Sequence, residues 1–356
     1  MGRRIRLSGL AVLGVLALAL VVAACGSSKK TSTSSSGGGA SSSSSSGGGG
    51  GANFKVGLVT DIGGLNDHGF NHLAYMGLTM AEQQLGIKGR VLTSNSGADY
   101  LPNLTTLAQQ GYNLVIPVGF LMAQAVDQVA KQFPSVKFAM VDSDATAEAG
   151  KPKNIEGLLF EEQQAGYLAG YLAGLYAKAH HYKTISSVGG QKIPPVDHYI
   201  AGYQAGAKKA DPGISTLNGY SQDFQDQTKC KQLALNQIAQ GSKVVFQVAG
   251  GCGLGALSAA QQQGVQGIGV DADQSYLGSY ILTSAEKKVD VAVFHAIQAA
   301  MHGQFMPAGD VTNNIANNGI GYGKIGPAGM QFSAQIQKIY NDIKSGKIAN
   351  IPNTVP

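Results

Sequence analysis

Short apolar segments alternate with longer helical segments from Phe54 to the C-terminus, and this alternation limits the possible folds more than any other feature. The short segments are predicted as strands: Phe54–Thr60, Arg90–Ser94, Leu114–Val118, Lys137–Val141, Ile185–Val188, Ser215–Gly219, Val244–Val248, Gly267–Val270 and Tyr280–Thr283. The longer ones are predicted as helices, including Phe70–Leu85, Leu121–Gln132, Glu162–Ala179, Ile200–Ala210, Gln227–Gln240 and Lys287–His302. Strands separated by helices favour α/β folds with parallel sheets, whose strands are apolar along their length because both faces are covered.

The number of predicted strands indicates two domains. A chain of 356 residues with 44% hydrophobic residues can bury two cores, and about nine strands are too many for one βαβ half. We therefore expect two doubly wound domains that face each other, with a first crossing between them near Asn154–Phe160.

The N-terminus is typical of an export signal. Three arginines precede the apolar run Leu7–Ala24, which stops at Cys25. The sequence Val22-Ala23-Ala24-Cys25 matches a bacterial lipobox, in which small residues admit the peptidase and the thiol receives diacylglycerol. Residues 1–24 are therefore predicted as a lipoprotein signal peptide, with lipid on Cys25. An uncleaved anchor is one alternative, although the run is near the lower length limit for a spanning helix. An ordinary secretory signal is the other alternative, but it would not explain the cysteine at position 25.

Residues 26–53 consist almost entirely of Ser, Gly, Thr and Lys. Such a segment cannot bury enough apolar surface to offset its ordering entropy, so residues 25–53 are predicted as a lipidated cysteine and a disordered tether. This arrangement predicts an exported protein that is held at the extracytoplasmic face of the cell membrane by its lipid.

The net charge does not indicate a nucleic-acid partner. The formal charge is +5, but three of the 26 basic residues lie in the predicted signal peptide. Without them 23 basic residues face 21 acidic ones, and no long Lys/Arg run is present.

Polar residues and glycines cluster after the predicted strands, where doubly wound sheets bind their ligands. These clusters are Thr60–Gly64, Asn66–Asn71, Pro117–Phe120, Val141–Asp144, Gly189–Pro195, Ser221–Asp226, Ala249–Gly253 and Val270–Gln274. They predict a ligand cleft between the domains. Gly and Asp also terminate strands and cap helices, and this simpler explanation accounts for about half of them.

Several chemistries lack the residues they need. The Gly-rich segment Ala249–Gly255 is not followed by the Lys-Ser/Thr of a phosphate-binding loop. The histidines lack carboxylates or cysteines at ligand spacing, so no metal site is expected. The strand-end aspartates are not accompanied by an evident Ser-His-Asp or Cys-His set. We therefore expect a binding protein without a cofactor rather than an enzyme.

Seven groups of residues carry a resemblance to a known family. They are Lys55–Asp61 with Gly63-Gly64, Asn66-Asp67 with Phe70-Asn71, Lys137–Asp142, Tyr167–Gly170, Ala249–Gly251, Gly269–Gln274, and Ser284 with Lys287–Ala292. They resemble the basic membrane protein (BMP) family of ABC-transporter substrate-binding lipoproteins, whose characterised members include purine-nucleoside receptors. The sequence departs from the usual family pattern at His68-Gly69, where a Lys-Ser pair is common.

The resemblance implies a type I periplasmic-binding fold, with two lobes joined by hinge strands. Lobe 1 would comprise residues 54–158 and about 285–325, and lobe 2 about 159–284 and 326–356. It implies a monomer that binds a nucleoside and delivers it to an ABC permease. A purine nucleoside is the expected ligand. A sugar or another small metabolite is an alternative ligand, and an exported enzyme on the same fold is an alternative function. The absence of Trp argues weakly against a typical sugar site.

The resemblance also implies roles for particular residues. Phe70 and Phe224 would stack on the base, with Tyr199 as an alternative partner, although core packing is an alternative role for each aromatic ring. Carboxylates and a lysine would hold the ribose hydroxyls by charge-assisted hydrogen bonds. The full predicted ligand-binding set is Asp61, Asn66, Asp67, Phe70, Asn71, Asp142, Tyr199, Phe224, Asp226, Gly250, Gly251, Asp271 and Lys287.

Two cysteines remain once Cys25 carries lipid. Cys230 and Cys252 are absent from many relatives, and each lies near the start of a predicted helix. In an oxidising compartment an even number of thiols is expected to pair, so these two are predicted to form a disulfide at the cleft rim. Two buried free thiols are the alternative.

Overall fold

The computed structural model describes residues 53–147, 150 and 152–355. The predicted signal peptide, Cys25 and the predicted tether up to residue 52 lie outside the described residues. In the part of the chain that is described, no helix is both long and apolar enough to cross a membrane.

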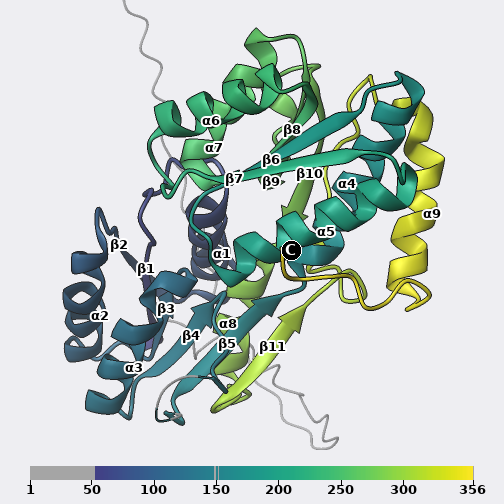
Figure 1. The fold of residues 1–356 in the computed structure, drawn as a ribbon. Helices are drawn as coiled ribbons and strands as arrows, with labels where there is room; N and C mark the ends of the chain where they lie inside the picture. The colour runs from purple at the N-terminus through teal and green to yellow at the C-terminus, as the bar shows by residue number, and fades with distance from the viewer. Residues whose placement is uncertain (1–52, 148–149, 151, 356) are drawn as a thin grey trace, which may run out of the picture. The chain divides into compact units, whose positions relative to one another are not determined.

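The first sheet has six parallel strands in the order β11-β5-β4-β3-β1-β2 (Figure 1). The strands are β1 (Lys55–Val59), β2 (Lys88–Leu92), β3 (Leu114–Pro117), β4 (Lys137–Val141), β5 (Ile155–Phe160) and β11 (Gly309–Asn313). The accompanying helices are α1 (Phe70–Leu85), α2 (Tyr100–Gln109), α3 (Ala123–Gln132) and α8 (Val289–Met301). Leu104, Val126 and Phe138 belong to a buried cluster formed by α2, α3 and the sheet, while α1 packs against α8.

The second sheet repeats this order as β12-β10-β9-β8-β6-β7. Its strands are β6 (Thr184–Gly189), β7 (Ser215–Tyr220), β8 (Ser242–Val248), β9 (Gln266–Asp271), β10 (Ile281–Lys287) and β12 (Ile320–Tyr322). Only β12 runs antiparallel to its neighbour among the described strands. The accompanying helices are α4 (Glu162–Ala179), α5 (Pro194–Ala210), α6 (Gln227–Ala239), α7 (Gly250–Gln262) and α9 (Ser333–Lys344). We call the first sheet with its helices lobe 1 and the second lobe 2.

The described chain passes between the lobes three times. It leaves β5 for α4, which packs on α5 and β10 of lobe 2, and it leaves β10 for α8, which packs on α1 of lobe 1. A third crossing joins β11 to β12. Two sequence predictions are corrected here. Lobe 1 does not extend to about residue 325, because β12 pairs with β10, and Lys287 ends a strand instead of beginning a helix.

Helices α4 and α5 pack backbone to backbone because of their glycines. A Cβ on Gly166 of α4 would lie 2.1 Å from the carbonyl oxygen of Tyr199, and one on Gly170 would lie 1.9 Å from that of Tyr203. No side chain fits at either point, so glycine permits the close approach. This packing fixes the start of α4, next to the first crossing, relative to Tyr199 on α5.

Candidate ligand-binding site

One cavity lies where strands of both sheets end. The space within it, open mouth included, is about 630 Å³, and both lobes contribute to its lining. Its lining from lobe 1 is Asp61, Ile62, Gly63, Asp67, Phe70, Asn71, Gly119, Phe120 and Asp142. Its lining from lobe 2 is Ile193, Pro195, Val196, Tyr199, Phe224, Val248, Gly250, Gly251, Val270, Asp271 and Lys287. The structure thus brings together the predicted ligand-binding residues except Asn66 and Asp226.

Two of the predicted polar residues cap helices, and a third lies outside the cavity. Asn66 is exposed and does not line the cavity, and the carboxylate of Asp226 caps α6 by accepting the N–H of Thr228 at 2.9 Å. Asp67 lines the cavity, but its carboxylate accepts backbone N–H groups at the start of α1, including that of Asn71 at 2.7 Å. Polar residues ahead of a helix often have this capping role.

Asp61 follows β1 and is 7% exposed. Its carboxylate accepts hydrogen bonds from the Tyr100 hydroxyl and the Ile62 N–H, and its own N–H donates to the Oδ1 of Asn71 at 2.8 Å. Burial raises the pKa of Asp61 to about 6, although the hydrogen bond from Tyr100 opposes the shift. The wall of lobe 1 therefore contains a buried carboxyl group whose pKa is raised by its burial.

Asp142 and Asp271 occupy corresponding positions in the two lobes, at the ends of β4 and β9. Both have a left-handed backbone, with φ of 65° and 64°. Asp and Asn tolerate this conformation better than most residues, because their short polar side chains can hydrogen-bond locally. The repeated conformation places one carboxylate from each lobe in the cavity wall, and both carboxylates are buried.

Lys287 is a buried cation at the second crossing between the lobes. It is 1% exposed, and its Nζ lies 2.6 Å from Asp142 and 2.9 Å from Glu162. The same Nζ lies 4.8 Å from the ring centre of Phe160 and 5.1 Å from that of Phe70. Lys287 in lobe 2 therefore connects a strand end of lobe 1 with the first residue of α4.

The ionisation of this group follows from one lysine facing several acids. Burial lowers the pKa of Lys287, but the charges of Asp142, Glu162 and Asp271 outweigh it and raise the pKa above its usual value. Burial raises the pKa of Asp142 to about 7 and that of Asp271 to about 6, against the attraction of Lys287. His198 connects the group to a more exposed position, because its Nδ1 lies 3.0 Å from the carboxylate of Glu162.

Aromatic residues from both lobes line the cavity. Phe70 is the first residue of α1, and Phe224 lies in the loop between β7 and α6; both are half-buried. Tyr199 is only 2% exposed, its ring meets Phe246 edge-on at 6.1 Å, and its hydroxyl donates to Asp271 at 3.3 Å. Phe70 and Phe224 are therefore more exposed in the cavity than Tyr199, whose hydroxyl is bonded to Asp271.

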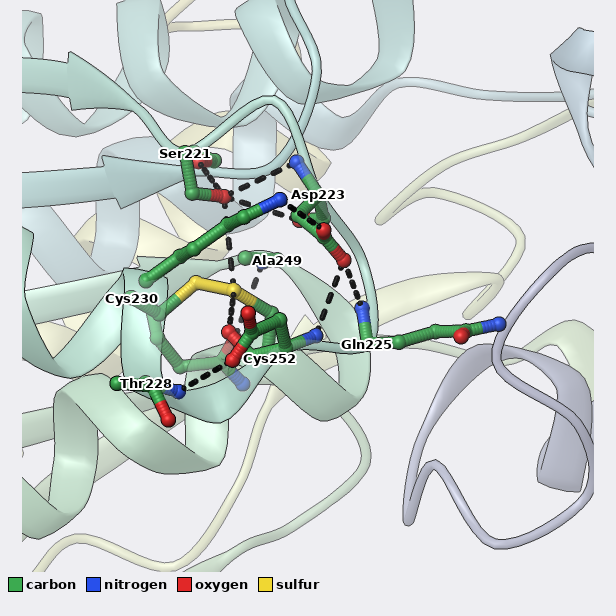
Figure 2. The surroundings of a disulfide bond; sticks show 11 residues. Ser221, Asp223, Gln225, Thr228, Cys230, Ala249 and Cys252 are labelled. Carbon is green, nitrogen blue, oxygen red and sulfur yellow. Dashed lines mark hydrogen bonds and ion pairs between the residues drawn. A yellow bond between two sulfur atoms is a disulfide. The ribbon is translucent and has the colours of Figure 1, made fainter.

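The sulfur atoms of Cys230 on α6 and Cys252 on α7 are bonded in the structure, with their Cα atoms 5.6 Å apart (Figure 2). Both cysteines are fully buried. The disulfide therefore joins the two helices that border the loop of Phe224. Within the described residues, no group of three or more His, Cys, Asp or Glu side chains could hold a metal ion.

Some residues that line the cavity, or that contact its lining residues, were absent from the sequence prediction. Glu162 pairs with Lys287. Its position just after the predicted first crossing between the domains is the sequence feature that could have indicated a role in the site. Tyr100 bonds Asp61 from α2, a helix outside the predicted set. Apolar lining residues such as Pro195 and Val196 are indistinguishable in sequence from core residues.

Comparisons with known proteins place the chain in the family that its sequence motifs resemble. The model of the Bmp family, described as "ABC transporter substrate-binding protein PnrA-like", matches residues 54–351. The ABC transporter nucleoside-binding protein BmpA of Lactococcus lactis is 33% identical over 83% of this chain and 89% of its own. An uncharacterised lipoprotein of Pyrococcus horikoshii is 34% identical over 76% of this chain and 69% of its own.

Solved structures show the same architecture. A solute-binding protein of an ABC transporter from Aeropyrum pernix superimposes with a TM-score of 0.75 at 25% identity, covering 84% of this chain and 94% of its own. One from Conexibacter woesei, at 22% identity, supports the fold with a TM-score of 0.67, covering 85% of this chain and all of its own. The predicted fold class and the family resemblance are both confirmed, and the chain belongs to the Bmp family of PnrA-like ABC transporter substrate-binding proteins.

Proposed function

We propose that this protein binds a nucleoside between its lobes and delivers it to an ABC permease. Within this ligand class we propose a purine nucleoside. The observation that carries the proposal is the pairing of Phe70 and Phe224, one from each lobe, in a single cavity. A flat base needs apolar contacts on its faces, and each stacking contact with an aromatic ring contributes about 1–3 kcal/mol. The relative in Lactococcus lactis that is named as nucleoside-binding supports this ligand class.

The polar part of the cavity suits a ribose. Asp61, Asp142 and Asp271 offer buried carboxylate oxygens, and Lys287 supplies a positive charge beside Asp142 and near Asp271. Vicinal hydroxyls can donate to carboxylates in charge-assisted hydrogen bonds, which are about twice as strong as neutral ones. A free sugar could form hydrogen bonds with the same polar groups, but it has no planar base to stack between the rings of Phe70 and Phe224.

Binding between the lobes also explains how a ligand could signal to a permease. The ion pair of Lys287 with Asp142 joins the end of β10 in lobe 2 to the end of β4 in lobe 1. A ligand held from both sides binds the closed arrangement more tightly and shifts the population toward it. The permease would then recognise the closed, loaded form of a monomeric receptor.

Calorimetry with adenosine, guanosine, inosine and free ribose tests the ligand class. The proposal expects at least one nucleoside to bind and ribose to show no binding at the same concentrations. Binding of ribose with equal or higher affinity would support a sugar receptor instead. If none of the four compounds binds, the nucleoside assignment is wrong.

We also propose that a lipid on Cys25 holds the protein at the extracytoplasmic face of the membrane, as the lipobox and the lipoprotein names of relatives suggest. The mature wild type should partition with membranes and begin at residue 25, and Cys25→Ser should release or misprocess it. A wild type that is fully soluble, or whose N-terminus lies upstream of residue 25, would contradict this anchor.

A further inference from the structure

The loop that carries Phe224 rests on the start of α7. The carbonyl oxygen of Phe224 accepts the N–H of Cys252 at 3.0 Å. A Cβ on Gly251 would lie 3.4 Å from this oxygen, so the carbonyl lies directly against the first turn of α7. The backbone of Phe224 is therefore fixed to the helix that contains one of the two disulfide cysteines.

The same loop is bound to α6 at its other end. Asp226 caps α6, and Asp223 accepts the N–H of Gln225 at 2.8 Å (Figure 2) and the Nζ of Lys229 at 2.7 Å. A Cβ on Gly255 of α7 would lie 1.9 Å from the carbonyl oxygen of Gln227, so α6 and α7 approach closely beside the disulfide. The position of the loop consequently depends on the spacing of these two helices.

The ring of Phe224 packs against the backbone of residue 190. A Cβ on Gly190, directly after β6, would lie 2.2 Å from the Cε1 of Phe224. The ring therefore lies flush against the backbone of residue 190 on one side and lines the cavity. A change in the spacing of α6 and α7 would move the ring relative to this contact.

We propose that the Cys230–Cys252 disulfide is a positioning element for Phe224, and that it raises ligand affinity by holding this ring in the cavity. The inference rests on the proposed function, because it treats Phe224 as a stacking partner of the ligand. A disulfide that served stability alone would not couple to the ring. The distinction can therefore be measured as an interaction between the disulfide and Phe224.

The test is a double-mutant cycle with inosine as the probe, or with whichever of the other two nucleosides the wild type binds most tightly. The disulfide is removed by C230A/C252A, and affinity is measured by calorimetry well below the unfolding temperature of each variant. We expect binding to weaken about tenfold in the wild-type background and to change less than about twofold in the F224A background. In the F70A background, where the ring of lobe 2 is intact, the tenfold loss should persist.

An unchanged affinity in C230A/C252A would overturn the proposal, and so would an equal loss with and without Phe224. If C230A/C252A does not fold, C230V/C252A replaces part of the lost volume and carries the same expectations. Gly190→Ala provides a second variant of the same ring contact: it should weaken binding, and its effect should vanish in the F224A background.

Hydrogen exchange provides a readout that needs no ligand. In C230A/C252A, amides in residues 221–228 should exchange faster, while those of α5 should keep their wild-type rates. Unchanged exchange in the loop would refute the positioning role even if no nucleoside binds. Absence of nucleoside binding to the wild type, together with faster exchange in the loop, would instead refute the proposed ligand and leave the mechanical coupling intact.

Discussion

Lobe 1 and lobe 2 follow the same strand order, β2-β1-β3-β4-β5 and β7-β6-β8-β9-β10, and place an aspartate at the same point of it. Asp142 and Asp271 even share the left-handed backbone. At the points where the chain leaves each lobe, however, the charges differ. An acid, Glu162, follows β5, whereas a base, Lys287, ends β10, and the two side chains meet at 2.9 Å.

This difference shows how a repeated scaffold can line one cavity with groups of opposite charge. Two identical carboxylates alone would repel each other in a buried cavity, because charged groups of one sign disfavour each other's ionisation. Lys287 supplies the opposite charge at the crossing, so the carboxylates can be buried beside it. The aromatic groups differ too: Phe70 belongs to a helix, and Phe224 belongs to a loop.

Replacing Lys287 removes the charge difference between the two lobes and should have the largest effect on stability of all the substitutions considered. Lys287→Met leaves Asp142 and Glu162 buried without their cation, a change that typically destabilises by about 3–5 kcal/mol. The variant should also lose nucleoside binding. The matched control is Lys192→Met, which removes an exposed ion pair with Asp197 and should lower stability by no more than about 1 kcal/mol. Denaturant unfolding measures both, and equal losses would contradict the role of Lys287.

The two aromatic rings provide the next comparison. Phe70→Ala and Phe224→Ala should each weaken nucleoside binding at least about tenfold, because each removes one stacking contact. Met76→Ala, on the exposed face of α1, serves as a control and should leave affinity unchanged. Calorimetry measures the three variants; full affinity in both phenylalanine variants would show that the base binds elsewhere.

The carboxylates predict opposite pH trends for stability and affinity. Burial raises the folded-state pKa of Asp61 and Asp271 to about 6, above the unfolded value of 3.8. The stability contributed by their protonated forms is complete below the unfolded pKa and is lost as pH rises through about 6. Nucleoside affinity should instead rise over this range, since the ionised carboxylates are the better acceptors.

Chemical unfolding and calorimetry between about pH 5 and about pH 8 test these trends. Asp61→Asn/Asp271→Asn removes two of the three cavity carboxyl groups with raised pKa values and leaves Asp142, so its stability and its residual affinity should vary less with pH than those of the wild type. Wild-type affinity that falls as pH rises would contradict carboxylate acceptors.

The sequence predicted most of the scaffold, because each strand end carries a local signal of glycine and polar residues. It missed α2, where Pro102 resembles a break but lies in the first turn, a position that tolerates proline. It also began α5 at Ile200, whereas the helix starts at Pro194. The pairing of Lys287 with Glu162 joins residues 125 positions apart, and only the crossing of the chain between lobes brings them together.

Substitutions of Asn66 and Asn71 should have the smallest effects on stability and affinity. They test which residues near the start of α1 belong to the cavity wall of lobe 1. Asn71 is buried and accepts the N–H of Asp61, so Asn71→Ala leaves that donor without its partner and should lower stability by about 1–3 kcal/mol. Asn66 is exposed and lies outside the cavity lining, so Asn66→Ala should change stability by less than about 0.5 kcal/mol and affinity by less than about twofold. Thermal unfolding and calorimetry measure both variants. A tenfold loss of affinity in Asn66→Ala would mean that Asn66 itself contacts the ligand, and the ligand-contacting residues of lobe 1 would then extend beyond Asp61, Phe70, Asn71 and Asp142.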